Sequence, residues 1–453
     1  MKKYSNYYII FCMTKSYLVE TFGCQMNVHE SEKISGSLSN LGYIPVQRRE
    51  DADIIVFNTC CIRDTAEKKI YGNIGDLKNY KKLKKDLIVA IVGCMSQQAG
   101  AIETLKSQFP FIDIILGTTN AHLVGEKVNE IINSRDKRKL KYYENVEPNN
   151  DIAENDVTLR TSYPNGWVNI MYGCNNHCTY CIVPYVRGPE KSRAPQLIMD
   201  ETQNLLKDGY KEITFLGQNV NSYSSEGWNF AKLLDTVAKL PYRFRLRFLT
   251  SHPRDLSDEI LDVIAKNEKI CKSIHLPVQA GSDDVLAKMN RHYTRNYYLS
   301  LVEKIREKLP TCVLTTDVMV GFPGETDENF EETINLIQRV KFSNAFTFVY
   351  SPRTGTVASR MVQISPQVKK DRITRLISVQ NEIVKDISQT SLNKTYEVLV
   401  EGVNQKGLLY GRAENGRLIT FPGDTNLVGE FIDVKIDKCR VSSLGGHIEN
   451  RDA

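Results

Sequence analysis

Three cysteines on one short segment carry the clearest chemistry in this 453-residue chain. Cys174, Cys178 and Cys181 lie in the segment GCNNHCTYC, directly after an apolar run, Val168–Met171, that predicts a strand. Three thiolates on one loop can each hold one iron of a [4Fe-4S] cluster, and the lack of a nearby fourth cysteine leaves one iron open to a ligand. Zinc is the alternative, but it normally takes four ligands, usually from two cysteine pairs. The spacing therefore favours an iron–sulfur cluster.

This CxxxCxxC motif resembles that of the radical S-adenosylmethionine (SAM) superfamily. The resemblance implies that SAM chelates the open iron and that an electron from the cluster cleaves SAM to a 5′-deoxyadenosyl radical. It also implies that Tyr180, which precedes the last cysteine, lies beside the adenine. In such enzymes the cofactor supplies the difficult chemistry and the protein orients it. No acid or base side chain is predicted to be catalytic.

A second set of cysteines is widely spaced along the chain. Cys24, Cys60 and Cys94 each follow an apolar run that predicts a strand of a parallel sheet. Because ligands gather at the carboxyl ends of such strands, the three thiols could converge on a second metal centre. Gly23 and Gly93 beside two of them would allow close approach of the backbone. The alternative is that each thiol is a small, inert, buried side chain.

An N-terminal α/β domain must position this second trio. Between residues 14 and 134, short apolar runs alternate with amphipathic stretches, a pattern typical of βαβ units around a parallel sheet. The expected strands are Tyr17–Phe22, Ile54–Phe57, Leu87–Val92 and Ile112–Leu116, and the expected helices are Glu30–Leu41, Arg63–Lys82, Gly100–Gln108 and His122–Asn133. Residues 135–159 are highly charged and poor in aliphatic side chains, which predicts a linker.

A second α/β region, residues 160–390, must position the first trio. Its strand-like runs are Val168–Met171, Ile213–Leu216, Arg245–Leu249, Ser273–Pro277, Val313–Val320 and Ala345–Tyr350. Six βα units predict a partial (βα)6 barrel of the TIM type, with its chemistry at the C-terminal rim of the strands. Residues 391–453 change to short β-rich runs separated by Gly and Asn, which predict a small antiparallel β-barrel.

Composition excludes some classes of protein. Hydrophobic residues make up 41% of the chain and charged residues 25%, as in folded globular proteins. The net charge of +5 permits a polyanionic partner without requiring one. No signal peptide and no run of about 20 apolar residues is present, so we expect a cytoplasmic protein that binds no membrane. In that compartment eleven cysteines indicate metal binding or catalysis and not disulfides, and Cys61, beside Cys60, is expected to point away from its trio.

Polar and small residues at the ends of the barrel strands are candidates for binding SAM, although tight turns would favour the same residue types. These candidates are Gly217, Gln218, Asn219, Gln279, Gly281, Ser282 and Gly321. Three arginines, Arg245, Arg291 and Arg295, are candidate contacts to an RNA substrate. For Arg245 the alternative is an ion pair with a buried carboxylate of the barrel.

Taken over nearly the whole chain, the sequence resembles the methylthiotransferase family, and within it the MiaB-type tRNA enzymes. The matching segments are TFGCQMNVHESE (21–32), NTCCIR (58–63), VGCMSQ (92–97), GCNNHCTYCIVPYVRGPEKSR (173–193), LGQNVNSY (216–223), TSHPRD (250–255), HLPVQAGSDDVLAKMNRHYTR (275–295), TTDVMVGFPGET (315–326) and YSPRTGT (350–356).

This resemblance implies a methylthiotransferase domain with an auxiliary [4Fe-4S] cluster on Cys24, Cys60 and Cys94, a radical SAM domain, and a C-terminal TRAM domain associated with RNA binding. The implied reaction is methylthiolation of C2 of N6-isopentenyladenosine next to the anticodon. One SAM donates the methyl group to sulfur at the auxiliary cluster and a second forms the radical. The implied partners are the tRNA anticodon stem-loop, an electron donor such as flavodoxin or ferredoxin, and a sulfur source.

The subgroup rests on a short discriminator. The segment Gly23–Asn27 reads GCQMN, whereas the ribosomal-protein enzymes typically read GCPKN and the threonylcarbamoyladenosine enzymes GCKVN. Gln25 and Met26 therefore resemble the isopentenyladenosine group. The alternatives are a methylthiotransferase that acts on threonylcarbamoyladenosine in tRNA or on a ribosomal protein, and a non-catalytic iron–sulfur protein that binds RNA.

Overall fold

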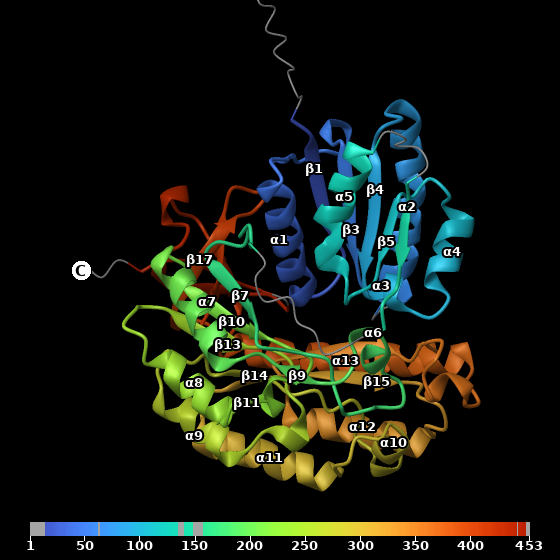
Figure 1. Cartoon of the computed structure of the whole chain (residues 1–453). Helices are drawn as coiled ribbons and strands as arrows, with labels where there is room; N and C mark the ends of the chain where they lie inside the picture. The colour runs from blue at the N-terminus through green and yellow to red at the C-terminus, as the bar shows by residue number, and fades with distance from the viewer. Residues whose placement is uncertain (1–13, 62–63, 135–139, 148–156, 442, 450–453) are drawn as a thin grey trace, which may run out of the picture. The chain divides into compact units, whose positions relative to one another are not determined.

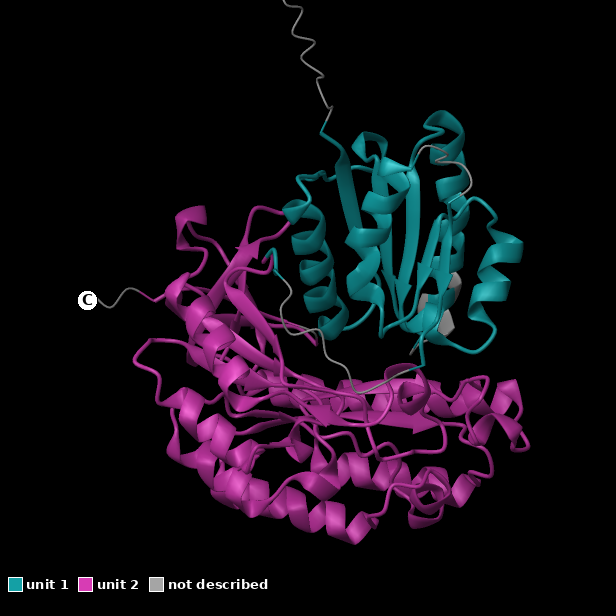
Figure 2. Cartoon of the chain, viewed as in Figure 1, with its two compact units in different colours: residues 1–159 teal, residues 160–453 magenta. Residues whose placement is uncertain are grey.

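The computed structural model describes residues 14–61, 64–134, 140–147, 157–441 and 443–449. Contacts within the chain divide it into two compact units, residues 1–159 (unit 1) and 160–453 (unit 2), shown in Figure 2. Each unit has its own parallel sheet and its own hydrophobic core. Within the described ranges, no helix is both long enough and apolar enough to cross a lipid bilayer.

Unit 1 is built on a six-stranded parallel sheet with the order β2-β1-β3-β4-β5-β6. The strands are β1 (Ser16–Thr21), β2 (Ile44–Pro45), β3 (Ile54–Thr59), β4 (Ile88–Gly93), β5 (Ile114–Leu116) and β6 (Tyr142–Glu144). The helices are α1 (Gln25–Asn40), α2 (Asp64–Leu83), α3 (Cys94–Gln97), α4 (Ala101–Gln108) and α5 (Val124–Asn133), seen around the sheet in Figure 1.

Central strands β3 and β4 are buried along their whole length, because helices cover both faces of the sheet. That burial explains why both read as unbroken apolar runs in the sequence. Two features differ from expectation. Strand β6 forms inside the stretch expected to be a linker, where its residues pair with β5, and the two-residue strand β2 was not predicted. Residues 135–139 and 148–156 of that stretch lie outside the described residues.

Unit 2 contains six parallel strands in two groups of three. They are β7 (Asn165–Asn169), β10 (Glu212–Leu216), β13 (Arg245–Phe248), β14 (Ser273–His275), β15 (Val313–Val320) and β16 (Asn344–Val349). An isolated parallel bridge between Leu246 and Ile270 joins the two groups. The long helices that follow the strands are α7 (Pro195–Lys207), α8 (Phe230–Ala238), α9 (Asp258–Lys266), α11 (Arg295–Lys308), α12 (Asp327–Val340) and α13 (Pro366–Gln389). The expected partial (βα)6 barrel is confirmed.

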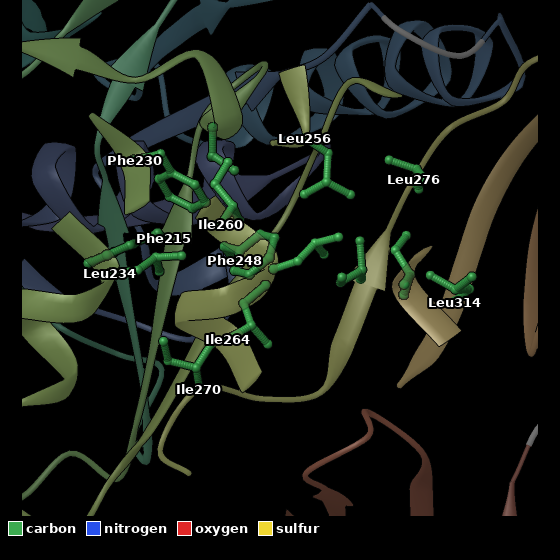
Figure 3. Packing of buried hydrophobic residues seen from close by; sticks show 14 of the residues in the cluster. Phe215, Phe230, Leu234, Phe248, Leu256, Ile260, Ile264, Ile270, Leu276 and Leu314 are labelled. Atoms are coloured by element: carbon green, nitrogen blue, oxygen red, sulfur yellow. The ribbon is translucent and has the colours of Figure 1, made fainter. Parts of the chain in front are cut away.

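The core of this barrel lies between its strands and its helices. Figure 3 shows Phe215 and Phe248 from neighbouring strands packed against Phe230 of α8. The rings of Phe230 and Phe248 meet edge to face, with centroids 5.3 Å apart. Burial of each such side chain stabilises the fold by about 1.5–3 kcal/mol. This core holds the strand ends, and therefore the site residues on them, in fixed positions.

The C-terminal part of unit 2 is a closed five-stranded barrel with the order β17-β18-β19-β21-β20. Its strands are β17 (Thr395–Val403), β18 (Leu409–Ala413), β19 (Leu418–Phe421), β20 (Phe431–Cys439) and β21 (Leu444–Ile448). The first four of these strands along the chain match the β-rich runs that the sequence predicts, Tyr396–Val403, Leu408–Arg412, Leu418–Thr420 and Phe431–Lys438. The fifth was missed, since LGGHI has two glycines and weak alternation.

Candidate functional site

The first cysteine trio lies in the loop between two short strands of unit 2, β8 (Met171–Tyr172) and β9 (Lys191–Ser192). The amide of Cys174 donates to the carbonyl of Gly188 at 3.2 Å, and the amide of Cys181 donates to the carbonyl of Cys178 at 2.9 Å. The thiols lie close enough for Cys178 to raise the pKa of both other thiols, although burial is the larger cause in each case. The loop thus folds the three thiols together.

Burial makes the thiols of Cys174 and Cys181 poor nucleophiles as long as they are free. Burial raises the pKa of Cys181 to about 12, so without a metal it stays protonated at neutral pH. Metal coordination deprotonates a cysteine outright. Within the described residues, no three His, Cys, Asp or Glu side chains lie close enough together to bind a single metal ion. A four-iron cluster asks for a different geometry, because each cysteine holds a separate iron.

The loop that follows helix α10 (Asp283–Lys288) holds the cysteine loop in place. The amide of Thr179 donates to the carbonyl of Met289 at 3.1 Å, and its hydroxyl donates to the carbonyl of Lys288 at 2.8 Å. The side chain of Asn290 donates to the carbonyl of His177 at 3.1 Å. Two segments more than 100 residues apart are therefore hydrogen-bonded along their length.

A chain of polar contacts that the sequence analysis did not assign links this loop to the rim of the barrel. Asn176 donates to the sulfur of Cys174 at 3.5 Å and accepts from the guanidinium of Arg254 at 2.7 Å. Arg254 pairs with Asp255, and Asp255 accepts from the amide of Asn219 at 2.7 Å. Arg254 and Asp255 could have been found from the sequence, because the segment TSHPRD (250–255) follows β13 at the same edge of the sheet as Asn219.

Of the predicted SAM contacts, Asn219 has the clearest free group. Its side-chain oxygen is buried and has no hydrogen-bond partner among the described residues. Gln279 lies beyond the end of β14, where it forms an isolated bridge with Val318 and has a positive φ of 70°, and its contact with SAM remains a prediction, as does that of Gln218. Ser282 stands at the N-cap position of α10, and its hydroxyl accepts from the side chain of Asn329 at 2.9 Å, so a structural role accounts for it.

Close packing accounts for the three rim glycines. A Cβ atom would lie 2.4 Å from Met171 at position 217, 2.5 Å from the backbone of Thr333 at position 281, and 2.4 Å from Lys369 at position 321. Contacts of Gly217, Gly281 and Gly321 with SAM stay predictions. Tyr180 packs against the cluster of buried residues around Phe322, and its hydroxyl lies 3.5 Å from Arg291.

Two of the three arginines predicted to contact RNA are buried and hydrogen-bonded within the protein, which gives each of them a structural role, and their contact with RNA stays a prediction. The guanidinium of Arg245 donates to the carbonyls of Arg412 and Glu397 in the C-terminal barrel. Arg291 points toward Cys178 and is only 5% exposed. Arg295 lies at the start of α11 and donates to Asn335 at 2.6 Å. Its contact with substrate stays a prediction.

In unit 1 the second trio follows three neighbouring strands. Cys24 caps α1 after β1, Cys60 follows β3, and Cys94 begins α3 after β4. Because β1, β3 and β4 are adjacent in the parallel sheet, the structure brings the three positions to one edge, as predicted.

Gly23 and Gly93 make this close approach possible. A Cβ atom at position 23 would lie 2.8 Å from the Cβ of Cys60, and one at position 93 would lie 2.5 Å from the carbonyl oxygen of Thr59. Gly93 also has a φ of 100°, which side chains disfavour. Any larger residue at either position would push the cysteine-bearing loops apart.

A buried pair of amides ties these loops together. Asn27 donates to the Asn58 side chain and to the carbonyl of Thr59, each at 3.1 Å, and Asn58 donates back to the carbonyl of Asn27 at 2.9 Å. The thiol of Cys24 donates to Asn27 at 3.3 Å. The positions of Cys24 and Cys60 therefore depend on one hydrogen-bond network.

The expectation that Cys61 points away from the trio is wrong. Strand β3 ends at Thr59, so the alternation of a strand no longer governs the two cysteines beyond it. A hydrogen bond with Cys94, followed by burial, raises the pKa of the Cys61 thiol. Unit 1 thus gathers four thiols, and Cys61 touches the edge of the trio.

Three family models match successive parts of the chain. Residues 16–117 match Uncharacterized protein family UPF0004, residues 168–337 match the Radical SAM superfamily, and residues 389–448 match the TRAM domain. The order agrees with the N-terminal sheet, the partial barrel and the closed barrel described above.

Among solved structures, the chain resembles the radical S-adenosylmethionine methyltransferase TsrM from Kitasatospora setae, with a TM-score of 0.55, 14% identity and 77% of each chain covered. It also resembles the cobalamin-dependent S-adenosylmethionine radical enzyme OxsB, with a TM-score of 0.52, 12% identity, and coverage of 83% of this chain and 56% of the other. At these identities the likeness concerns the fold alone.

Curated relatives are much closer in sequence. A tRNA-2-methylthio-N(6)-dimethylallyladenosine synthase of Clostridium botulinum (strain Langeland) is 49% identical over 95% of this chain and 96% of its own length. Synthases of the same name from Desulforamulus reducens and Acetivibrio thermocellus are each 45% identical over 96% of this chain, and cover 96% and 91% of their own lengths. Identity of this size over the full length, with the domain order and both cysteine trios in place, shows that the chain belongs to the tRNA-2-methylthio-N(6)-dimethylallyladenosine synthase family.

Proposed function

We propose that this chain adds a methylthio group to C2 of N6-isopentenyladenosine next to the anticodon of tRNA, using SAM and two cysteine-bound [4Fe-4S] clusters. The observation that carries the proposal is that each unit presents its own cysteine trio, in a chain related over its full length to synthases named for this product. Cys174, Cys178 and Cys181 hold the cluster that binds SAM, and Cys24, Cys60 and Cys94 hold the auxiliary cluster.

The reaction class follows from the substrate atom. An aromatic C–H bond has no leaving group and no acidic proton, so general acid–base catalysis has nothing to act on. When bound, the cluster and SAM supply a radical that can take the hydrogen. The side chains of this protein bind SAM and orient the cysteines that hold the clusters. Asn219 offers its free oxygen to SAM, and the loop after α10 fixes the loop of the first three cysteines. The amides of Asn27 and Asn58 fix Cys24 and Cys60 of the auxiliary trio.

The partners of this reaction are the tRNA anticodon stem-loop, a one-electron donor such as flavodoxin or ferredoxin, and a sulfur source. The match of residues 389–448 to the TRAM domain supports an RNA substrate. We assign residues 14–134 to the methylthiotransferase domain, 160–390 to the radical SAM domain and 391–453 to the TRAM domain, with 135–159 as the segment between the first two. A cytoplasmic location suits thiols that must stay reduced.

The test is a single reaction under anaerobic conditions. Reconstituted protein, dithionite, SAM and tRNA carrying isopentenyladenosine should yield 5′-deoxyadenosine and the 2-methylthio nucleoside, read by mass spectrometry of the digested tRNA. Cys178→Ala should abolish both products, whereas Cys312→Ala, a cysteine of the same barrel outside the trio, should keep them. Methylthio groups only on threonylcarbamoyladenosine or on a ribosomal protein would overturn the substrate assignment, and absence of 5′-deoxyadenosine would overturn the enzyme class.

A further inference from the structure

Arg291 is a buried cation in contact with one of the cysteines. Its side chain is 5% exposed, and its Nη1 donates to the sulfur of Cys178 at 3.2 Å. A charged group in such a place costs several kcal/mol unless an opposite charge compensates it.

Among the described residues, no carboxylate pairs with Arg291 to supply that negative charge. Besides Cys178, Arg291 donates from Nε to the hydroxyl of Tyr293 at 3.0 Å and from Nη2 to the carbonyl of Pro277 at 2.9 Å, and its Nη1 lies 3.5 Å from the hydroxyl of Tyr180. The other buried arginines of unit 2 differ. Each pairs with a carboxylate: Arg193 with Glu201, Arg245 with Glu397, Arg247 with Glu212, and Arg372 with Glu325.

The backbone on both sides of Arg291 is in the left-handed region. The residues on both sides of it, Asn290 and His292, have positive φ angles of 60° and 56°. Such angles cost about 1 kcal/mol or more each for residues other than glycine, and they persist only where surrounding structure enforces them. Asn290 is tied to the cysteine loop through the carbonyl of His177. The fold therefore points this guanidinium at the cysteine sulfur at a conformational cost.

We propose that Arg291 is the counter-ion and hydrogen-bond donor of the iron–sulfur cluster held by Cys174, Cys178 and Cys181, and that it raises the reduction potential of that cluster. The inference rests on the proposed function, which places a cluster there. A cluster bound by three thiolates is anionic, and uptake of one electron makes it more so. Net charge and hydrogen bonds to the sulfurs are two of the factors that set the potentials of such clusters. A fixed cation beside Cys178 therefore favours the reduced form.

The test measures the potential of this cluster alone. The full chain carrying Cys24→Ala, Cys60→Ala and Cys94→Ala keeps only the trio of interest, and anaerobic titration with dithionite and mediators, without SAM, is followed by electron paramagnetic resonance. Arg291→Met should lower the equilibrium constant for reduction at least tenfold, which is about 59 mV for a one-electron couple. Arg291→Lys, which keeps the charge but loses the planar donor fork, should give a smaller shift.

Lys288→Met is the matched control. The carbonyl of Lys288 accepts from Thr179 of the cysteine loop, but its ammonium group is exposed and donates to the carbonyl of Gly324, so removing this charge should shift the potential by a small fraction of the Arg291→Met effect. An unchanged potential in Arg291→Met would overturn the inference, including the case in which only SAM binding weakens, since Arg291 would then serve the SAM carboxylate. If the triple-alanine protein with Arg291 intact takes up no iron, that result would instead overturn the proposed function.

A second measurement separates the charge from a merely structural role. In the iron-free chain Arg291 lacks its counter-charge, so Arg291→Met should melt no lower than the parent. With the cluster loaded, the order should reverse and Arg291→Met should melt lower or lose iron faster. An iron-free Arg291→Met variant that is destabilised or unfolded would show that Arg291 acts through its hydrogen bonds to Tyr293 and Pro277, and would overturn the inference. A folded variant that cannot retain iron would support it.

Discussion

Arg247 and Glu212 form a doubly hydrogen-bonded ion pair inside unit 2, between neighbouring strands β13 and β10. Nε and Nη2 of the guanidinium donate to the two carboxylate oxygens, each at 3.0 Å, and both side chains are less than 10% exposed. Arg247 also donates to the carbonyls of Ala413 and Glu414, at the turn between β18 and β19. One guanidinium thus joins the partial barrel to the C-terminal barrel.

Arg247→Met should therefore destabilise the protein strongly. It leaves the Glu212 carboxylate buried without a partner, and breaking a buried pair in this way costs about 3–5 kcal/mol. Chemical denaturation of the iron-free chain measures the loss. Arg243→Met removes an exposed arginine that pairs with Glu397 and should cost less than about 1 kcal/mol. Adding Glu212→Gln to Arg247→Met should recover part of the loss, and a double variant no better than the single one would contradict this account.

Stability should fall in mild acid through His252. Burial, followed by the charge of Arg291, lowers the pKa of His252 to about 2, whereas the unfolded chain has the ordinary value of about 6.5. Below pH 6.5 the imidazole of His252 therefore takes up a proton in the unfolded chain but stays neutral in the folded chain. The neutral ring contributes its full stability above that pH and loses it progressively as the pH falls toward 2.

His252→Asn tests this pH dependence, because asparagine does not titrate in this range. Its side-chain oxygen can still accept a hydrogen bond from the backbone amide of Arg254, as the imidazole does now. From pH 7.5 to 5.5 the parent should lose about 1.4 kcal/mol more unfolding free energy than the variant. The comparison cancels every other titrating group. A difference between the two proteins that stays constant with pH would show that His252 titrates alike in both states.

Removal of the unit 1 trio should halve the iron content. Three thiolates per cluster predict about eight irons in the reconstituted parent and about four in the variant Cys24→Ala, Cys60→Ala, Cys94→Ala. Iron counting and absorption spectra read the result. Cys61→Ala is the matched control, since Cys61 touches Cys94 but stands outside the trio, and it should keep about eight irons. Loss of four irons in Cys61→Ala would assign that thiol as a ligand.

Asn27→Ala should weaken both the fold of unit 1 and its hold on iron. The change removes the donor to Asn58 and Thr59 in a fully buried network, at a cost of about 1–3 kcal/mol. Denaturation of the iron-free chain and the rate of iron loss to a chelator measure the two effects. Asn133→Ala, an exposed asparagine of α5, should change stability by less than about 0.5 kcal/mol. Equal effects at both positions would rule out the network as the cause.

Much of the architecture could be predicted because it depends on local pattern. Unbroken apolar runs predicted β3 and β4. A cysteine after each of three such runs predicted that the three cysteines share one edge of the sheet. Very short or glycine-containing strands such as β6 and β21 could not be predicted, because pairing with a neighbour decides them. Cys61 was misplaced for a related reason, since the end of β3 is set by the sheet and not by its own residues.

The sequence by itself determined the chemistry of this protein: which thiols stand in trios, at what spacing, and in which family of chains. Only the tertiary structure decided the use of its charges. Arg245 and Arg291 look alike in the sequence and both suggested contacts with RNA, yet one is bonded to the C-terminal barrel and the other faces Cys178. The physical reason is that residue type states the charge, while burial and partners, which depend on segments far apart in the chain, decide what that charge does.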